Sequence, residues 1–223
     1  MSAEDPDLLV TGERVALGPL RPDLAETYGR WMNQPEVRFG VEYLAIATPQ
    51  SQEEWIEESN KAAAKREPES VTFTIYDLVD RAPVGTCSLF QISYLQSSAH
   101  FGISLGERRG QGLGGEATRL TLDWGFHVLG LHNVLLEALA WNTAAIRAYE
   151  RAGFRRIGIR REAAMSRGDR TDVVLMDALR ADFGASVIAG DTRRAHARQP
   201  ADHSSAPGGR FAPQSGVRTR APR

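Results

Sequence analysis

The sequence is short of cysteine, of long apolar runs and of net charge, and each shortage excludes a class of protein. Its single cysteine, Cys87, excludes an intrachain disulfide and is typical of a reducing compartment. No apolar run approaches the roughly 18 residues of a membrane span, and the first residues lack the apolar core of a signal peptide. We therefore expect a cytoplasmic protein with no membrane partner, in which Cys87 is a small apolar residue of a buried strand.

The net charge of −1 conceals two segments of opposite sign. Residues 185–223 hold seven Arg against two Asp, a charge of +5, which leaves −6 for residues 1–184. This last segment is rich in Ala, Arg, Pro and Gly and lacks apolar periodicity, so we predict a disordered tail. Its arginines are scattered rather than clustered, which argues against a nucleic-acid partner. The preceding 1–184 segment is long enough to form one domain with a sizeable core.

Apolar periodicity predicts alternating helices and strands within residues 1–184. Strands are expected at 14–20, 71–76, 84–94, 99–105, 134–140, 154–160 and 173–179. Helices are expected from Pro22, from a capping box at Ser51 to Lys65, from Glu116 to near Gly130, and over 143–151. Asp172 is expected to tie the last two strands together.

A cluster of glycines follows the predicted strand 99–105. The cluster reads Arg109-Gly110-Gln111-Gly112-Leu113-Gly114-Gly115. Its glycines let the backbone turn sharply and bring its N–H groups close to a ligand. A helix that opens at Glu116 would add the free amides of its first turn and the positive end of its dipole. These features together predict an anion site of the kind that binds phosphate.

The glycine run can be interpreted in two ways. As Gly110-x-Gly112-x-x-Gly115 it fits the dinucleotide fingerprint, with Glu137 near the place of the ribose-binding acid. Against this, the charged segment 106–109 separates the strand from the first glycine. A P-loop is excluded because no Gly-Lys-Ser/Thr follows.

The second interpretation starts from Arg109, because Arg-Gly-Gln-Gly-Leu-Gly is an R-x-x-G-x-G sequence. About 30 residues later, Asn142 is followed by Tyr149 and then by Gly153-Phe154. Together these motifs resemble the two signatures of the Gcn5-related N-acetyltransferases (GNAT). The resemblance spans residues 12–183, and the segment after the first helix is similar to the RimJ/RimL branch. It implies an α/β fold with a mixed, mostly antiparallel sheet and helices on both faces.

The resemblance also implies how acetyl-CoA would be held. Amides of the glycine run would bind the CoA pyrophosphate, and Arg108 or Arg109 would pair with its charge. Backbone groups of Ile103 and Leu105 would bind the pantetheine arm like an added strand. Asn142 would hydrogen-bond the same arm in addition to capping its helix.

Acyl transfer to an amine needs a base, because a free alkylamine has a pKa of about 10 and must lose a proton. The resemblance makes Tyr149 the candidate general acid for the leaving thiolate. Glu137, in an otherwise apolar strand, would either point into the cleft as base or acceptor-binding acid, or pair with an arginine. His100, Glu42 in a loop, and an ordered water relay are the alternatives, and no metal is implied.

We therefore expect an acetyl-CoA-dependent N-acetyltransferase acting on a primary amine. The acceptor would be a small molecule such as a polyamine, an aminoglycoside or another amine metabolite, or else a protein N-terminus. The net charge of −6 on residues 1–184 favours a cationic acceptor. Two further classes stay open, a CoA-binding regulatory module without catalysis and a nucleotide binder, and the chain could form a homodimer.

Overall fold

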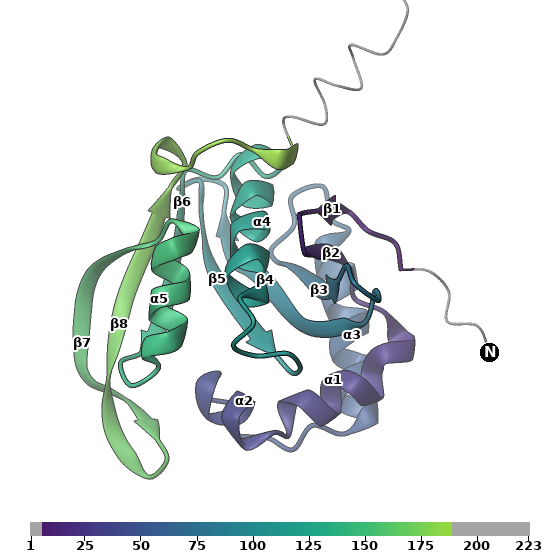
Figure 1. Ribbon diagram of the computed structural model, residues 1–223, viewed down its shortest axis with the longest axis horizontal. Helices are drawn as coiled ribbons and strands as arrows, with labels where there is room; N and C mark the ends of the chain where they lie inside the picture. Colours follow the sequence, from purple (N-terminus) through teal and green to yellow (C-terminus); the bar gives the residue numbers. More distant parts are fainter. Residues whose placement is uncertain (1–5, 189–223) are drawn as a thin grey trace, which may run out of the picture.

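The computed structural model describes residues 6–188, which form one mixed sheet covered by helices (Figure 1). Eight strands make up the sheet: β1 (Val10–Thr11), β2 (Val15–Pro19), β3 (Val71–Asp77), β4 (Pro83–Ser93), β5 (Ser98–Leu105), β6 (Asn133–Leu139), β7 (Arg155–Ser166) and β8 (Asp169–Leu179). Five α-helices accompany them within the described residues: α1 (Ala25–Met32), α2 (Pro35–Gly40), α3 (Pro49–Ala63), α4 (Leu113–His127) and α5 (Thr143–Ala152). Short 3-10 helices precede α1 and follow β8.

The strand order is β1-β2-β3-β4-β5-β6-β8-β7, and every neighbouring pair is antiparallel except β5 and β6. This parallel pair is joined only from Ser98 to His100, opposite Asn133 to Leu135. Beyond His100, β5 pairs with β4 alone and β6 pairs with β8 alone. The sheet therefore opens between β5 and β6, and the predicted mixed, mostly antiparallel class is confirmed.

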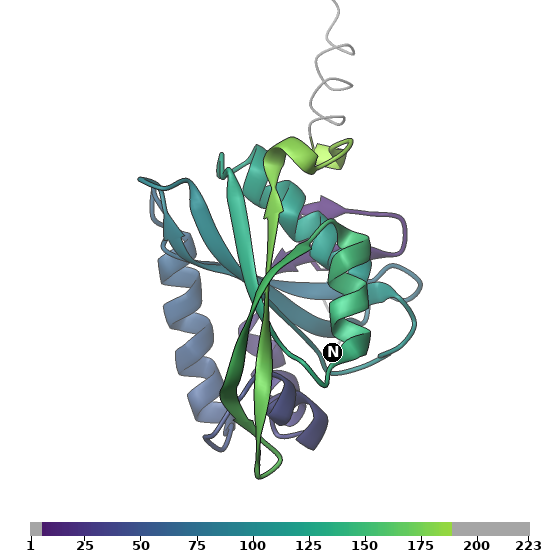
Figure 2. The ribbon, with the colours of Figure 1, turned by 90° about the vertical axis from the view of Figure 1, so that its left-hand side faces the viewer.

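The helices cover both faces of the sheet, with α3 on one side and α4 and α5 on the other (Figure 2). On the α4 face, the ring centroids of Trp124 and Phe73 are 5.4 Å apart in an edge-to-face arrangement. On the other face, Tyr28 and Trp31 of α1 pack with Ile56 of α3 in a separate buried cluster. Two apolar layers thus hold the sheet from both sides, as the resemblance described above implies.

Two predicted helix starts are wrong by a few residues. The helix after the glycine run begins at Leu113 rather than at Glu116, because Gly112 adopts a φ of 84° and turns the chain into the helix. The Glu116 carboxylate instead accepts the backbone N–H groups of Glu13 and Arg14 at 2.6 and 2.9 Å. The capping box of α3 is formed by Thr48 with Ser51, so this helix begins at Pro49.

Two predictions about single side chains are confirmed. Cys87 is buried in β4, its sulfur lies 3.1 Å from the Thr121 hydroxyl, and burial raises the pKa of its thiol to about 12. Asp172 accepts a hydrogen bond from the Glu162 backbone N–H at 2.8 Å and so ties β8 to β7. These two strands are longer than predicted, since pairing continues to Ser166 and Asp169.

The folded part extends past the predicted boundary at residue 184. The buried carboxylate of Asp123 accepts the Ser186 hydroxyl at 2.6 Å and the Val187 N–H at 2.7 Å. Ordered packing thus reaches Ile188, and the rest of the predicted tail, residues 189–223, lies outside the described part of the chain. No helix within residues 6–188 is long and apolar enough to cross a membrane.

Candidate active site

A cavity of about 820 Å³ lies where β5 and β6 part, between the sheet and helices α1 to α3. It brings together five of the predicted residues: Glu42, His100, Ile103, Glu137 and Tyr149. The described residues that line it include no Lys or Arg. Much of the wall is aromatic or hydroxylic, with contributions from Tyr28, Trp31, Trp55, Ser59, Ser88 and Ser104. Such a wall suits a ligand that is cationic or rich in hydrogen-bonding groups.

Tyr149 reaches the cavity from α5, and packing fixes its ring. Phe101 and Phe154 each lie 6.1 Å from its ring centroid in edge-to-face contacts. No described residue hydrogen-bonds the hydroxyl, and burial raises the pKa of Tyr149 to about 12. The phenol therefore stays protonated at neutral pH, with its donor free for a bound molecule.

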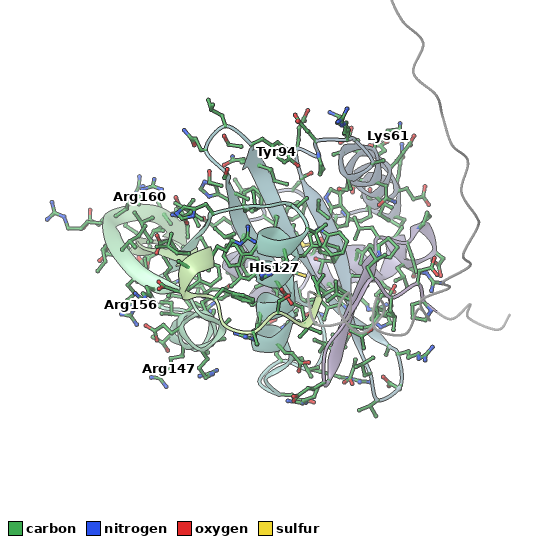
Figure 3. The ribbon with its side chains drawn as sticks, turned by 90° about the horizontal axis from the view of Figure 1, so that it is seen from above. Lys61, Tyr94, His127, Arg147, Arg156 and Arg160 are labelled. Carbon is green, nitrogen blue, oxygen red and sulfur yellow. The ribbon has the colours of Figure 1, made fainter. Side chains whose placement is uncertain are left out.

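Glu137 is not enclosed in the sheet as the apolar strand around it suggests, since 46% of its side chain is exposed. Arg160 of β7 reaches across β8 and donates to both carboxylate oxygens, at 2.8 and 3.0 Å. Figure 3 shows Arg160 on the outer strand, well away from Lys61 on α3. Glu137 thus both lines the cavity and is paired with an arginine, the two possibilities that its sequence leaves open.

His100 occupies the last parallel rung before β5 and β6 separate, opposite Leu135. Its ring centroid lies 5.7 Å from that of Phe90, and the side chain is half-buried. An imidazole at this point faces the opening of the sheet without an ion-pair partner among the described residues. His100 is thus a half-buried imidazole on the cavity wall, as its candidacy as a base requires.

The glycine loop leads directly into the start of α4. Gly110 and Gly112 have φ values of 79° and 84°, and no side chain caps the helix. A Cβ at Gly110 would meet nothing within 4 Å, so the backbone here borders open space. The first amides of this 15-residue helix therefore have no side-chain cap within the described residues, and the anion site stays a prediction.

The two arginines before this loop are already engaged by the protein. Arg108 donates to Asp77 and, at 3.0 Å, to Asp80 in the β3–β4 turn, and these two carboxylates raise the pKa of the guanidinium. Arg109 donates to the Leu105 carbonyl at 2.7 Å and to Gln34. Neither guanidinium is free to serve an anion without giving up a contact within the protein.

Asn142 caps α5, as its position predicts, because its side-chain oxygen accepts the Ala145 N–H at 3.2 Å. Ile103 and Leu105 pair with Cys87 and Gly85 of β4, and their other edge faces the opening beside β6. That edge is where an extended ligand could add to the sheet.

The part of the cavity wall that α1 and α2 contribute was not predicted from the sequence, and neither were the contacts of Trp31. The Trp31 indole N–H donates to Glu107 at 3.0 Å, across 76 positions of sequence. No local pattern links two residues so far apart. The local signals for α2 are the proline at its start, Glu36 in its first turn and Arg38 in its last turn.

Residues 14–155 match the model of the acetyltransferase (GNAT) domain family, so the chain belongs to this family. It is 38% identical over 97 residues to the probable N-acetyltransferase YjcK of Bacillus subtilis (strain 168), which is 42% of this chain and 53% of that protein. It is 31% identical over 101 residues to the spermidine N(1)-acetyltransferase of Vibrio cholerae serotype O1, covering 45% and 58%. The matches thus span little more than half the length of these curated relatives.

Solved structures share the fold at lower identity. The spermidine N-acetyltransferase from Vibrio cholerae in complex with CoA and spermine has a TM-score of 0.68 at 23% identity, covering 77% of this chain and 99% of that one. The ribosomal-protein-S5-alanine acetyltransferase from Vibrio fischeri has a TM-score of 0.70 at 19% identity, covering 80% and 100%. At these identities the likeness establishes the arrangement of strands and helices.

Proposed function

We propose that the protein is an N-acetyltransferase that moves the acetyl group of acetyl-CoA to the primary amine of a small molecule. One observation carries the proposal: Gly114, at the uncapped start of α4, lies beside Ile103 and Leu105 of β5, and Ile103 lines the cavity that also holds Tyr149 and His100. Family membership supports the reaction type. The small-molecule acceptor is supported by the partial match to a spermidine acetyltransferase.

For acetyl-CoA, we assign the pyrophosphate to the amides of Gly112 to Gly115 at the start of α4, where a helix dipole favours negative charge. The pantetheine arm would lie along the edge of β5 that does not pair with β4, at Ile103 and Leu105, where the Leu105 carbonyl also accepts from Arg109. Asn142, at the start of α5, would hydrogen-bond the same arm. Because Arg108 is already paired with Asp77 and Asp80, the backbone amides at the start of α4, rather than Arg108, would be the main anion donors.

In the reaction, the acceptor's ammonium group first gives up its proton, and His100 or a water that it holds takes it. The nitrogen lone pair then forms a bond to the thioester carbonyl carbon, and the carbonyl electrons move to oxygen. A backbone amide of β5 would stabilise this oxyanion. When the carbonyl re-forms, the carbon–sulfur bond breaks, and the nitrogen gives its second proton to solvent water, which leaves a neutral amide. Tyr149 donates a hydrogen bond to the departing thiolate.

Glu137 is not assigned to proton abstraction, because Arg160 donates to both of its oxygens. We assign it to the wall of the acceptor site, since it lines the cavity. Glu42 also lines this wall, which has no lysine or arginine among its described residues, and Glu42 has no ion-pair partner within residues 6–188. This charge pattern favours an acceptor that brings positive charge into the cavity. It gives no specific support to a RimJ/RimL-like protein acceptor.

The test is thiol release from acetyl-CoA, followed with a thiol-reactive dye across a panel of acceptors. The panel contains spermidine, an aminoglycoside, a simple alkylamine and a peptide with a free alanine N-terminus. We expect turnover with a small amine. Turnover with the peptide alone would favour a protein N-terminal acetyltransferase, and tight CoA binding without any turnover would favour a non-catalytic module.

A further inference from the structure

The loop that leads into the glycines also holds the acceptor-side wall of the cavity. Trp31 lines the cavity, is 3% exposed, and lies flat against the backbone of Gly106. A Cβ at Gly106 would come within 2.0 to 2.2 Å of the indole ring atoms, so only glycine allows this approach. The indole N–H then donates to Glu107 at 3.0 Å. Two successive loop residues thus fix the position of one cavity side chain.

A second contact from the same loop reaches α2. Arg109 donates to the side chain of Gln34, the residue before α2, and lies 3.8 Å from Glu36 in its first turn. The same guanidinium holds the Leu105 carbonyl at 2.7 Å. Helix α2 runs directly into residues 40–43, which line the cavity. The loop therefore contacts the cavity wall at two places, Trp31 and the start of α2.

We propose that Glu107 is a positioning residue that couples the CoA site to the acceptor site by holding Trp31. This inference rests on the proposed function, because it assigns the glycine loop to CoA and the cavity to the acceptor. Residues 106–109 lie between β5 and the amides assigned to the pyrophosphate, so CoA that orders the loop also orders the Trp31 wall. Acceptor affinity then rises when CoA is bound, and by linkage the acceptor strengthens CoA binding equally.

The direct test follows hydrogen exchange in the segment 33–43 with CoA alone as the probe. In the wild type, CoA should slow hydrogen exchange in this segment by about fivefold, which is the fold-change that the net free energy of one hydrogen bond produces. In Glu107→Ala and in Gln34→Ala the slowing should shrink, while Glu107→Gln keeps an acceptor oxygen for the indole and should restore it. Glu26→Ala removes a similar carboxylate from an exposed position on α1 and is the matched control.

Kinetics give a second readout, with the panel amine that shows the highest turnover. Glu107→Ala should raise the acceptor KM about fivefold with kcat within twofold, a split that general loss of stability would not produce. CoA binding without any change of exchange in 33–43 would overturn the inference and leave the proposed function intact. Absence of CoA binding to the wild type would overturn both. Equal effects of Glu107→Ala and Glu26→Ala would also overturn the inference.

Discussion

Replacing Tyr149 by phenylalanine separates catalysis from folding, because its hydroxyl makes no hydrogen bond within the described protein. The ring keeps its contacts with Phe101 and Phe154, so no packing is lost. Removing a hydroxyl that makes no hydrogen bond within the protein leaves no partner unsatisfied, so stability should change little. We expect the free energy of unfolding to change by less than about 0.5 kcal/mol.

The effect on rate follows from two pKa values. Burial raises the pKa of Tyr149 to about 12, whereas an alkylthiol such as the leaving group has a pKa of about 8.5. Full proton transfer from phenol to thiolate is therefore uphill, and the phenol acts mainly by donating a hydrogen bond to the developing charge. General acids contribute roughly 10² to 10⁴ in rate, so we expect a loss near the lower end, about 100-fold in kcat.

The assay compares kcat at saturating acetyl-CoA and acceptor, with urea denaturation in parallel. Tyr94→Phe is the control, because its hydroxyl donates to the Pro68 carbonyl at 3.2 Å and lies outside the cavity. The control should keep kcat within about twofold of the wild type. If Tyr149→Phe also kept wild-type kcat, Tyr149 would not be the acid, whatever its position beside β5.

Two further predictions concern the loop. Arg108→Ala should lower the Tm and leave the Kd for CoA within about threefold, because Asp77 and Asp80 already compensate its charge. Arg108 also lowers the pKa of Asp80. The stability that this ion pair contributes is therefore complete above about pH 4 and is lost as the pH falls through the lowered pKa of Asp80. Arg108→Ala should therefore flatten the acid end of a Tm–pH profile, and an unchanged profile would contradict this. Gly106→Ala should cost about 1–3 kcal/mol in urea denaturation by pushing Trp31 out of place; a wild-type midpoint would show that the ring can move freely.

The helix that follows the glycine run shows what a local sequence pattern can and cannot predict. The glycine run predicted a turn followed by a helix, and the structure has both. The prediction placed the helix start at Glu116, a reasonable acid for a first turn. Its carboxylate instead binds amides at Glu13 and Arg14, more than 100 positions away. Sequence spacing cannot reveal a partner at that distance.

Charged residues illustrate the same limit. An apolar strand around Glu137 predicted that the carboxylate needs a partner or a ligand, which is a local statement about desolvation. The partner, Arg160, is reached only because β8 lies between β6 and β7 in the sheet. Likewise, the sequence placed Arg108 and Arg109 beside an anion site, whereas folding directs one to the β3–β4 turn and the other to α2.

By itself, the sequence determined the order of strands and helices, the turn-forming glycines and the family to which the chain belongs. These depend on side-chain periodicity and on φ preferences, which act over a few residues. Only the tertiary structure decided where β5 and β6 part, which side chains meet in the cavity, and that Glu107 holds Trp31. Those features arise from contacts between distant segments, whose geometry the packing of the whole sheet and its helices sets.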